Sequence, residues 1–522
     1  MSYFKQLNRI SFGPKQVEIN HLKEVGWEAF VDEQLNPGEE PAELEPLMKE
    51  TAYHWKVSYA SDDRPPQRLK AYFEPGRETY RRIWQSGKTP EKIDIRLPFY
   101  ETIIVSWLKA IHSPWQLREI MVEFWHNHFA VSGADEDMIA LTFAAYDRDA
   151  IRPNVFGNFR VMLEAVAKSP AMLYYLDNAF NLAGPANENY ARELFELHTL
   201  GEENYLNDQY ETWDKVPGAL EGKAIGYIDE DVYEAARAFT GWTVGVNPHQ
   251  SLSIPTTGEF YYYDNWHDHY QKRVMGIDFP GHQGPMADGY KVLDILAAHE
   301  GTARFVCKKI CKWLVSDNPS KSVVQKAVDT WMAHRESTDQ IARTLRTILL
   351  SPEFMEGLGS KIKRPNHLIL SFARTTESNF VPNSSAYWWC HAMGYHQFSS
   401  PFPTGNPDDA NAWLNSDIML KRWLIFSTLD QLVKEDGYFS LDLALQIPES
   451  VRSVDDLIDL FSNKLWNGKV EPPVREELTR IFSKDLPTDS FAELRTQYPE
   501  TFESKSLHLA GMLAMSPQFQ IR

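Results

Sequence analysis

Apolar residues recur with a helical period along most of the chain. Segments 96–113, 155–177, 229–242, 291–315 and 410–433 place large apolar side chains three or four positions apart. That spacing brings the apolar side chains to one face of an α-helix. Strands do not alternate with helices, so neither a Rossmann fold nor a barrel is expected. The pattern predicts an all-α protein, a large multi-helix globular fold with long loops and at most a small β-hairpin.

Three segments depart from this helical pattern. The aromatic run GEFYYYD, residues 258–264, is the best strand candidate and is expected on one side of the hairpin. Residues 202–228 are polar and acidic without a clear period, which predicts an exposed loop or an arm ordered by a partner. Residues 396–411 are rich in Pro, Gly, Ser and Asp, which also indicates a loop.

The loop that begins at residue 396 divides the predicted domains. Residues 1–395 are expected to form a main helical domain, and residues 396–522 a C-terminal helical part. The apolar density is similar on both sides of the loop. We therefore expect the C-terminal part to pack on the main domain as one integrated unit.

Composition narrows the class of protein. The net charge is -19. Proteins bind nucleic acids and anionic membrane surfaces through concentrated Lys and Arg, so neither is expected as a partner of this chain. No uninterrupted apolar run reaches the length of about 18 residues that a membrane span needs. The first residues also lack the apolar core of a signal peptide, which predicts a cytoplasmic location. Of three cysteines, Cys307 and Cys311 are spaced i, i+4, which predicts buried thiols on one helix face.

The first polar motif is EFWHNHF, residues 123–129. Successive helical residues turn by about 100°, so His126 and His128 should point about 200° apart. They can bind one metal ion only if the helix ends between them. Glu123 and His126 also have the Glu-x-x-His spacing of di-iron bundles, as do Glu18 and His21, but such matches are common by chance.

The second motif is NENYARELFELH, residues 187–198. Glu188, Arg192 and Glu196 follow at i, i+4 on one stripe, with Glu193 beside them. Three interpretations remain open: a solvated face with Glu–Arg pairs, a buried ion network, or carboxylates turned toward an internal site. The apolar segment before the motif favours burial, where a carboxylate must be paired or bind a metal.

The third motif is DNWHDHYQK, residues 264–272. His267, Asp268 and His269 are adjacent in a predicted loop, where side chains can converge without helical constraint. A histidine beside a carboxylate can serve as a general base or a metal ligand, although a solvated cluster has the same sequence. The chain contains no Walker loop, no His-Glu-x-x-His and no Gly-x-Ser-x-Gly.

Ten stretches together resemble a known family. They are LNRISFGP, FWHNHF, SPAMLYYLDN, NENYARELFELHTLG, EDVYEAARAFTGW, HDHYQK, TARFVCKKICKWLV, LLSPEF, KRPNH and MLAMSPQFQIR. In this order, and over essentially the whole chain, they are similar to the domain-of-unknown-function-1800 family. Glu123, Glu18 and His21 lie outside the signature motifs of that family. The polar residues that fall within them are His126, Asn127, His128, Asn187, Glu188, Asn189, Arg192, Glu193, His267 and Asp268.

The resemblance implies a large bacterial family of helical proteins whose activity is not established. Many members carry export signals. Many are encoded beside proteins of the domain-of-unknown-function-1501 family, which resembles the alkaline phosphatase–sulfatase superfamily and supplies a possible protein partner. This chain departs in its N-terminus, which lacks an export signal, and in residues 202–228, which look like an insertion.

Two hypotheses for function follow. The first is a hydrolase or oxidoreductase that depends on a divalent metal ion and has one composite site. Its predicted catalytic residues are His126, His128, Glu188, Arg192, Glu193, His267 and Asp268, and its predicted metal ligands are His126, His128 and Glu188. The second is a non-catalytic scaffold that assembles with a partner, in which the same polar residues form a structural network.

Overall fold

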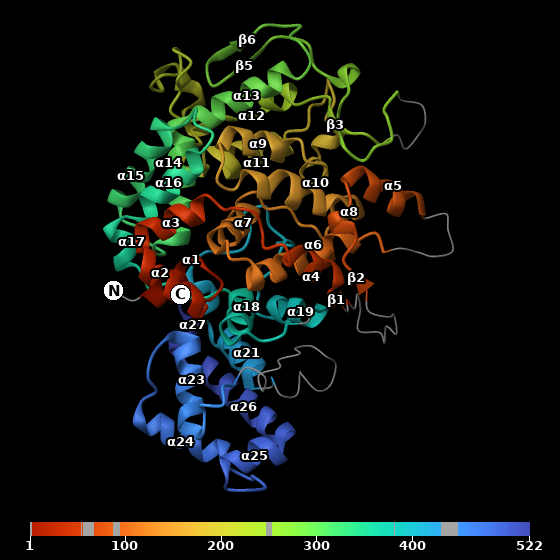
Figure 1. Ribbon diagram of the computed structural model, residues 1–522. Helices are drawn as coiled ribbons and strands as arrows, with labels where there is room; N and C mark the ends of the chain where they lie inside the picture. Colours follow the sequence, from red (N-terminus) through yellow and green to blue (C-terminus); the bar gives the residue numbers. More distant parts are fainter. Residues whose placement is uncertain are drawn as a thin grey trace.

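The computed structural model of the chain is predominantly helical (Figure 1). It describes residues 3–53, 55, 67–86, 94–246, 253–380, 382–427, 429 and 447–522. Helices account for 61% of it, whereas about a third of an average globular protein is helical. The all-α prediction is confirmed.

The helices follow one another with short connections. The first ten are α1 (Tyr3–Ile10), α2 (Gln16–Val25), α3 (Trp27–Leu35), α4 (Leu44–Glu50), α5 (Gly76–Ser86), α6 (Leu97–His112), α7 (Gln116–His128), α8 (Asp137–Ala145), α9 (Phe159–Ala167) and α10 (Pro170–Tyr175). The middle of the chain contains α11 (Asn189–Glu193), α12 (Asp229–Ala238), α13 (Ala287–Ala298), α14 (Glu300–Leu314), α15 (Lys321–Ala333), α16 (Gln340–Leu349), α17 (Pro352–Glu356), α18 (Pro365–Thr376) and α19 (Ser384–Ala392). The last are α20 (Ala410–Trp413), α21 (Ser416–Ser427), α23 (Val454–Trp466), α24 (Pro472–Phe482), α25 (Phe491–Gln497), α26 (Pro499–Ala514) and α27 (Pro517–Gln520).

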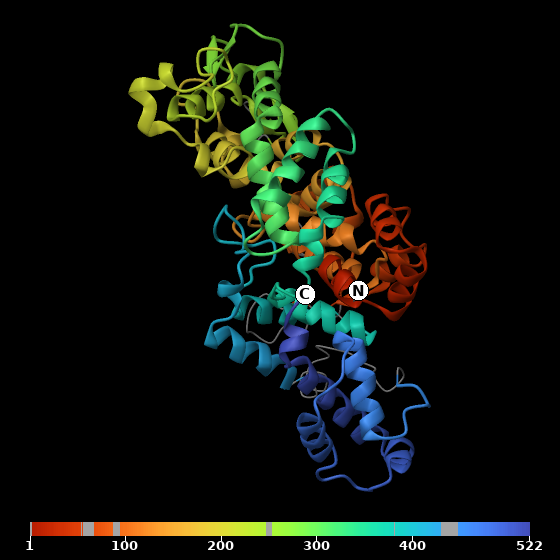
Figure 2. The same cartoon turned by 90° about the vertical axis from the view of Figure 1, so that its left-hand side faces the viewer.

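Helix α7 lies at the centre of this arrangement and positions the first polar motif. Helices α1, α3 and α6 pack around it, and nearly all of its residues are buried. One hydrophobic core continues from Phe4 to Phe519 and includes residues of α7, α18 and α23. Figures 1 and 2 show α23–α26 at one end of an elongated molecule and the β5–β6 region at the other. The division at residue 396 stays a prediction.

Capping residues divide some of the predicted helices. Segment 291–315 forms α13 and α14, because the His299 ring accepts a hydrogen bond from the backbone N–H of Gly301 and starts a new helix. Segment 155–177 is divided at Pro170, which occupies the first position of α10. Segment 410–433 contains α20 and α21, and its residues 430–433 lie outside the described residues.

The strands are short and few within the described part of the chain. Strand β3 (Trp242–Val244) pairs antiparallel with β4 (Phe260–Tyr262), as the aromatic run predicted. Two further pairs, β1 (Ala52–Tyr53) with β2 (Gln67–Arg68) and β5 (Lys272–Val274) with β6 (Ile277–Phe279), correct the expectation of a single hairpin. Each is too short to form a layer of the core.

Residues 202–228 are more ordered than an irregular loop. The 3-10 helix η7 (Asn207–Lys215) has no buried residue, but Tyr205 and Tyr227 form a β-bridge that closes the segment at its base. Beneath it, Val216, Ala219 and Ala224 form a small apolar cluster. The exposed part agrees with the predicted loop, and contacts within the chain close the segment at its base. No helix in the described ranges has the length and apolar character to cross a membrane.

Candidate functional site

The two histidines of EFWHNHF, His126 and His128, lie on opposite sides of α7. The helix runs through His128, so the ring of His126 and the ring of His128 cannot converge on one ion. His126 Nε2 lies 2.8 Å from Asp147 Oδ1. His128 Nε2 lies 3.1 Å from the carbonyl oxygen of His198. The predicted divergence of the two rings is confirmed.

The His126 side is a buried network in which every carboxylate has a cation. Arg152 donates to Asp147 Oδ2 at 2.7 Å and to Glu119 Oε2 at 2.8 Å. Tyr72 Oη donates to the same Asp147 oxygen at 2.7 Å. Burial alone would raise the pKa of Asp147, but Arg152 and His126 outweigh it and hold the pKa well below its usual range. Asp147 is therefore ionised and fully paired, as in a structural network.

Asn127, the residue between the two histidines, binds the loop formed by residues 394–408. Asn127 Nδ2 donates to the carbonyl oxygen of Asn406 at 2.9 Å, and the N–H of Asn406 donates to Asn127 Oδ1 at 2.7 Å. The Asn406 side chain bonds in turn to the backbone of His396. Gly405 has φ +77°, and a Cβ there would lie 2.4 Å from the carbonyl oxygen of Asn127. Only glycine permits this contact between residues 394–408 and α7.

His128 has a free lone pair. A carbonyl oxygen only accepts hydrogen bonds, so the contact with His198 places the proton of the neutral ring on Nε2. Nδ1 is then an acceptor, and this buried atom has no partner in the described residues. Burial, and next the charge of Lys309, lower the pKa of His128 well below its usual value. The ring is neutral at pH 7 and can accept a hydrogen bond at Nδ1.

His128 lines the first of two cavities, the loop cavity, which is bounded by α7, α14, the start of α18 and residues 394–408. Its volume is about 610 Å³. Its lining residues are Phe124, Asn127, His128, Lys309, Lys312, Trp313, Arg364, Gly394, His396, Ser400, Pro401, Phe402, Thr404, Gly405, Asn406, Pro407 and Asp408. The segment that indicated a linker in the sequence is thus one wall of a cavity.

Lys309 supplies an unpaired cation to the loop cavity. Its ammonium makes no hydrogen bond or ion pair with any described residue. Lys309 Nζ lies over the Phe305 ring, 5.2 Å from the ring centroid. The side chain is half-buried, and burial lowers the pKa of Lys309 from 10.5 to about 8. Its neighbour Lys308 instead faces solvent and lies 2.8 Å from Glu203.

The one carboxylate that lines the loop cavity is already shared by other cations. Asp408 Oδ1 lies 3.1 Å from Lys361 Nζ and 3.7 Å from Arg364 Nη2. Lys312 is 3.9 Å from Asp409. Asp408 acts on Lys309 only at longer range, so within the described residues Lys309 has no carboxylate in direct contact beside this open volume.

A buried ionic cluster supports the wall formed by Arg364. Glu123 Oε2 accepts from His367 Nε2 at 2.7 Å, and its Oε1 lies 3.4 Å from Arg364 Nη1. Burial would raise the pKa of Glu123, but His367, Arg364 and Arg522 lower it to about 2. Arg364 and Arg522 also lie over the Trp313 ring, at 4.3 and 4.2 Å from its centroid. These contacts fix both Arg364 and Trp313 at the cavity surface.

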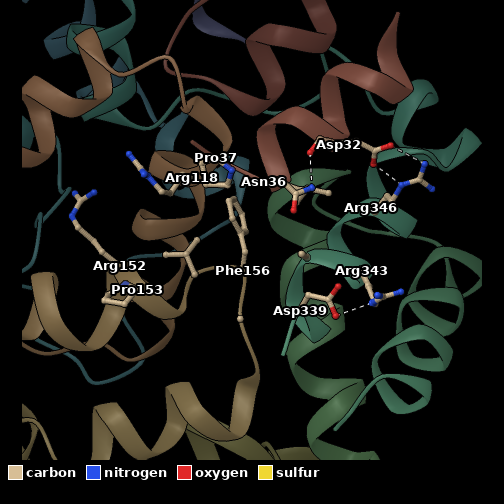
Figure 3. A pocket seen from close by; sticks show the side chains of 14 residues that line it. Asp32, Asn36, Pro37, Arg118, Arg152, Pro153, Phe156, Asp339, Arg343 and Arg346 are labelled. Carbon is tan, nitrogen blue, oxygen red and sulfur yellow. Dashed lines mark hydrogen bonds and ion pairs between the residues drawn. The ribbon is translucent and has the colours of Figure 1, made fainter. Parts of the chain in front are cut away.

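The second cavity, the arginine cavity, lies between α3, α7, residues 152–157 and α16 and has a volume of about 590 Å³. Figure 3 shows Arg118 and Arg152 on one side of it and two ion pairs on the other. The pairs are Arg346 with Asp32, at 2.6 Å, and Arg343 with Asp339, at 2.8 Å. Arg118 contacts Glu40 and Glu119, and Arg152 contacts Glu119 and Asp147. Each arginine thus has its own carboxylate.

Glu188 and Arg192 form an ion pair on the surface. They are 3.1 Å apart, their side chains are 40% and 37% exposed, and Asp229 lies 3.0 Å from Arg192. The interpretation of these two residues as a buried network is wrong. Glu193 is half-buried, and burial together with Glu196 raises its pKa. This motif meets α7 at the His198 carbonyl rather than at its charged residues.

His267 and Asp268 belong to a third set of contacts. His267 Nδ1 lies 2.9 Å from the Thr240 carbonyl oxygen, and its Nε2 lies 3.4 Å from Asp288. Asp268 accepts two hydrogen bonds from Arg237, at 2.8 and 3.1 Å. Among described residues, no hydrogen bond or ion pair joins either one to the α7 histidines or to Glu188, Arg192 or Glu193.

These partners do not fit the predicted metal site. His126, His128 and Glu188 each contact a different group, so they do not form one coordination shell. The described ranges contain no group of three or more His, Cys, Asp or Glu side chains arranged around a common point. The catalytic roles assigned to the seven residues stay predictions. The thiols of Cys307 and Cys311 are buried and free, as expected.

Sequence reasoning missed the cations of the loop cavity. Lys309 and Arg364 lie in the stretches TARFVCKKICKWLV and KRPNH, which indicated the family but no chemistry. A signal was present in the helical spacing: Lys309 follows the buried Val306 by three positions and precedes the buried Trp313 by four, which places it at the edge of the buried face of α14. A partly desolvated charge at such an edge is a candidate for a ligand contact.

The chain belongs to the family described as "Protein of unknown function (DUF1800)", whose family model matches residues 5–521. This confirms the resemblance over essentially the whole chain. No curated protein and no solved structure matched the chain.

Proposed function

We propose that the protein binds a small organic anion, with a carboxylate or phosphate group, in the loop cavity as its substrate. One observation carries this proposal. Lys309 presents an ammonium group to a cavity of about 610 Å³ and has no partner among the described residues. A bound anion would supply the missing partner.

The remaining charges of the loop cavity support an anionic ligand. Lys312 and Arg364 line it beside Lys309, whereas Asp408, its one acidic lining residue, is held by Lys361 and Arg364. The whole chain carries a net charge of -19, so a local excess of cations is a specific feature of this site. Attraction is strong here because the surroundings are partly desolvated.

The aromatic and histidine side chains favour an organic ligand over a bare inorganic ion. Phe124, Trp313 and Phe402 offer apolar surface, as in ordinary small-molecule sites. His128 Nδ1 is a neutral acceptor, so it suits a hydroxyl or another donor on the ligand.

Titration calorimetry with lactate, 2-hydroxyglutarate and glycerol 3-phosphate tests the proposal. The wild type should bind at least one of these anions with one site per chain. Lys309→Met should weaken that binding at least about tenfold, which corresponds to about 1.4 kcal/mol. Arg343→Met is the matched control, because it removes a cation from the arginine cavity that already has a carboxylate.

Two results would contradict the proposal. One is the absence of binding by all three anions at millimolar concentration. The other is equal weakening in Lys309→Met and Arg343→Met, which would mean that the anions respond to the general charge of the protein and not to the loop cavity. Circular dichroism of each variant verifies that the fold is retained.

A further inference from the structure

We propose that Lys309 is a nucleophile that forms an imine with an aldehyde or ketone carbonyl of the bound anion. This rests on the proposed function, because the anionic group, once drawn into the loop cavity and held by Lys312 and Arg364, would bring the carbonyl carbon to Lys309. The substrate class narrows from any small organic anion to one that carries a carbonyl.

The geometry of the loop cavity supports a covalent role for this lysine. Buried lysines elsewhere in the protein have a polar partner: Lys361 lies 2.7 Å from Asp317, and Lys363 donates to Ser371 Oγ at 2.7 Å. Lys309 has none, and its ammonium lies against the Phe305 ring beside the cavity. A desolvated amine next to an aromatic surface is the environment in which lysines act as nucleophiles.

A hydrogen-bond acceptor lines the same cavity. His128 and Lys309 both line it, and the Phe305 centroid lies 6.3 Å from that of the His128 ring and 5.2 Å from Lys309 Nζ. Among the described residues His128 Nδ1 has no partner, because Nε2–H is directed to the His198 carbonyl. It can accept a hydrogen bond from a hydroxyl of the ligand or of the carbinolamine.

The step needs no further reactant. At mildly alkaline pH the Lys309 ammonium gives one proton to solvent, and the free amine adds to the carbonyl carbon, forming a C–N bond and a carbinolamine. The former carbonyl oxygen takes up one proton from the nitrogen and one from solvent and leaves as water. In sum, the ammonium and the carbonyl compound give a protonated imine and one water molecule, with no change of oxidation state.

The ionisation of Lys309 agrees with this chemistry. Burial lowers its pKa to about 8, so a substantial fraction of the amine is free at mildly alkaline pH. An ordinary surface lysine with a pKa near 10.4 is almost wholly protonated there.

Borohydride trapping tests the inference on the full-length protein. Pyruvate, 2-oxoglutarate and dihydroxyacetone phosphate are the probes, and their hydroxy analogues lactate, 2-hydroxyglutarate and glycerol 3-phosphate are the controls without a carbonyl. Borohydride reduces an imine to a stable secondary amine, which peptide mass spectrometry assigns to a residue. We expect the Lys309 peptide to be labelled at least about tenfold faster than other lysine peptides, with a rate that rises through pH 8.

Two variants sharpen the result. Lys309→Arg keeps the positive charge but cannot form an imine, so labelling at this position should disappear. Lys308→Arg changes the neighbouring lysine, which faces solvent beside Glu203, and labelling of Lys309 should persist. The hydroxy analogues should compete with the carbonyl probes and protect Lys309.

The outcomes separate the two proposals. If the hydroxy analogues bind but no carbonyl probe labels Lys309 selectively, the imine inference is overturned and the anion site stands. If labelling spreads over the surface lysines at similar rates, the inference is likewise overturned. If no hydroxy or carbonyl anion binds, and no carbonyl probe labels Lys309, both the anion-binding proposal and the imine inference are contradicted.

Discussion

Two cavities of similar volume flank α7, and both contain several cations, yet only one of them has a cation without a partner. In the arginine cavity, Arg343 and Arg346 each contact a carboxylate within 2.8 Å. In the loop cavity, Lys309 Nζ lies 5.2 Å from the centroid of the Phe305 ring and forms no ion pair within the part of the chain that the structure describes. The comparison teaches that the number of cations around a cavity does not indicate an anion site. An anion site is indicated by the number of cations that remain unpaired after each carboxylate of the protein has been assigned to its own cation.

The largest expected effect comes from the ionic cluster beside the loop cavity. Glu123→Ala removes a buried carboxylate that lies 3.4 Å from Arg364 and is the acceptor of His367, so the free energy of unfolding should fall by about 3–5 kcal/mol. Asp339→Ala breaks a half-exposed pair of the arginine cavity and should cost less than about 1 kcal/mol. Urea unfolding of both variants measures the contrast, and equal losses would remove the distinction between the two cavities.

Lys309→Met should stabilise the protein, because it replaces an unpaired, half-buried cation. The pKa of Lys309 is about 8 when folded and 10.5 ordinarily, so its penalty is complete below pH 8 and disappears as the pH rises toward 10.5. We expect a gain on the order of 2 kcal/mol at pH 7 that declines between pH 8 and 10.5. Arg343→Met should show neither the gain nor this pH dependence. A destabilised Lys309→Met at pH 7 would show that the amine has a partner.

Substitution of Asn127 should change the loop cavity and leave the arginine cavity unaffected. Asn127→Ala removes both hydrogen bonds to the Asn406 backbone and should cost about 1–2 kcal/mol. Protease cleavage within residues 394–408 should accelerate, as followed by mass spectrometry. The arginine cavity does not contact this loop, so cleavage near residues 152–157 should stay unchanged. Unaltered cleavage of the loop would mean that other contacts hold it.

Glu188→Ala should have the smallest effect. The Glu188–Arg192 pair is about as exposed as the pairs of the arginine cavity, so its loss should change stability by less than about 1 kcal/mol. The change should also vanish in 1 M salt, where exposed charges are screened. A loss of several kcal/mol would restore the buried-network interpretation of this motif.

The fold could be predicted from the sequence further than the site could. Helical period reports which face of a segment is apolar, and it identified the segments that form α6, α7 and α12. It also predicted that His126 and His128 diverge. It could not predict the break at His299, because a capping side chain ends one helix and starts the next without changing the apolar period.

The site depends on contacts that sequence spacing does not encode. Lys308 and Lys309 are identical neighbours, and only the position of Glu203 and of the 394–408 loop decides which of them is paired. The role of Asn127 depends in the same way on Gly405, far along the chain. Glu188 and Arg192 suggested a chemical role because many charged residues occur together in their motif. In the structure, however, these two residues pair with each other, and Arg192 also pairs with Asp229.

The most direct test of the account is the pKa of Lys309, measured by carbon-13 NMR on protein labelled at the lysine ε carbon. The Lys309 resonance is identified by its absence in Lys309→Arg. We predict a pKa of about 8 in the free protein and a higher value when an organic anion such as 2-hydroxyglutarate saturates the site. A pKa near the ordinary value of about 10.4 in the free protein, unchanged by the anion, would contradict the central claim that Lys309 is an unpaired cation awaiting an anionic partner.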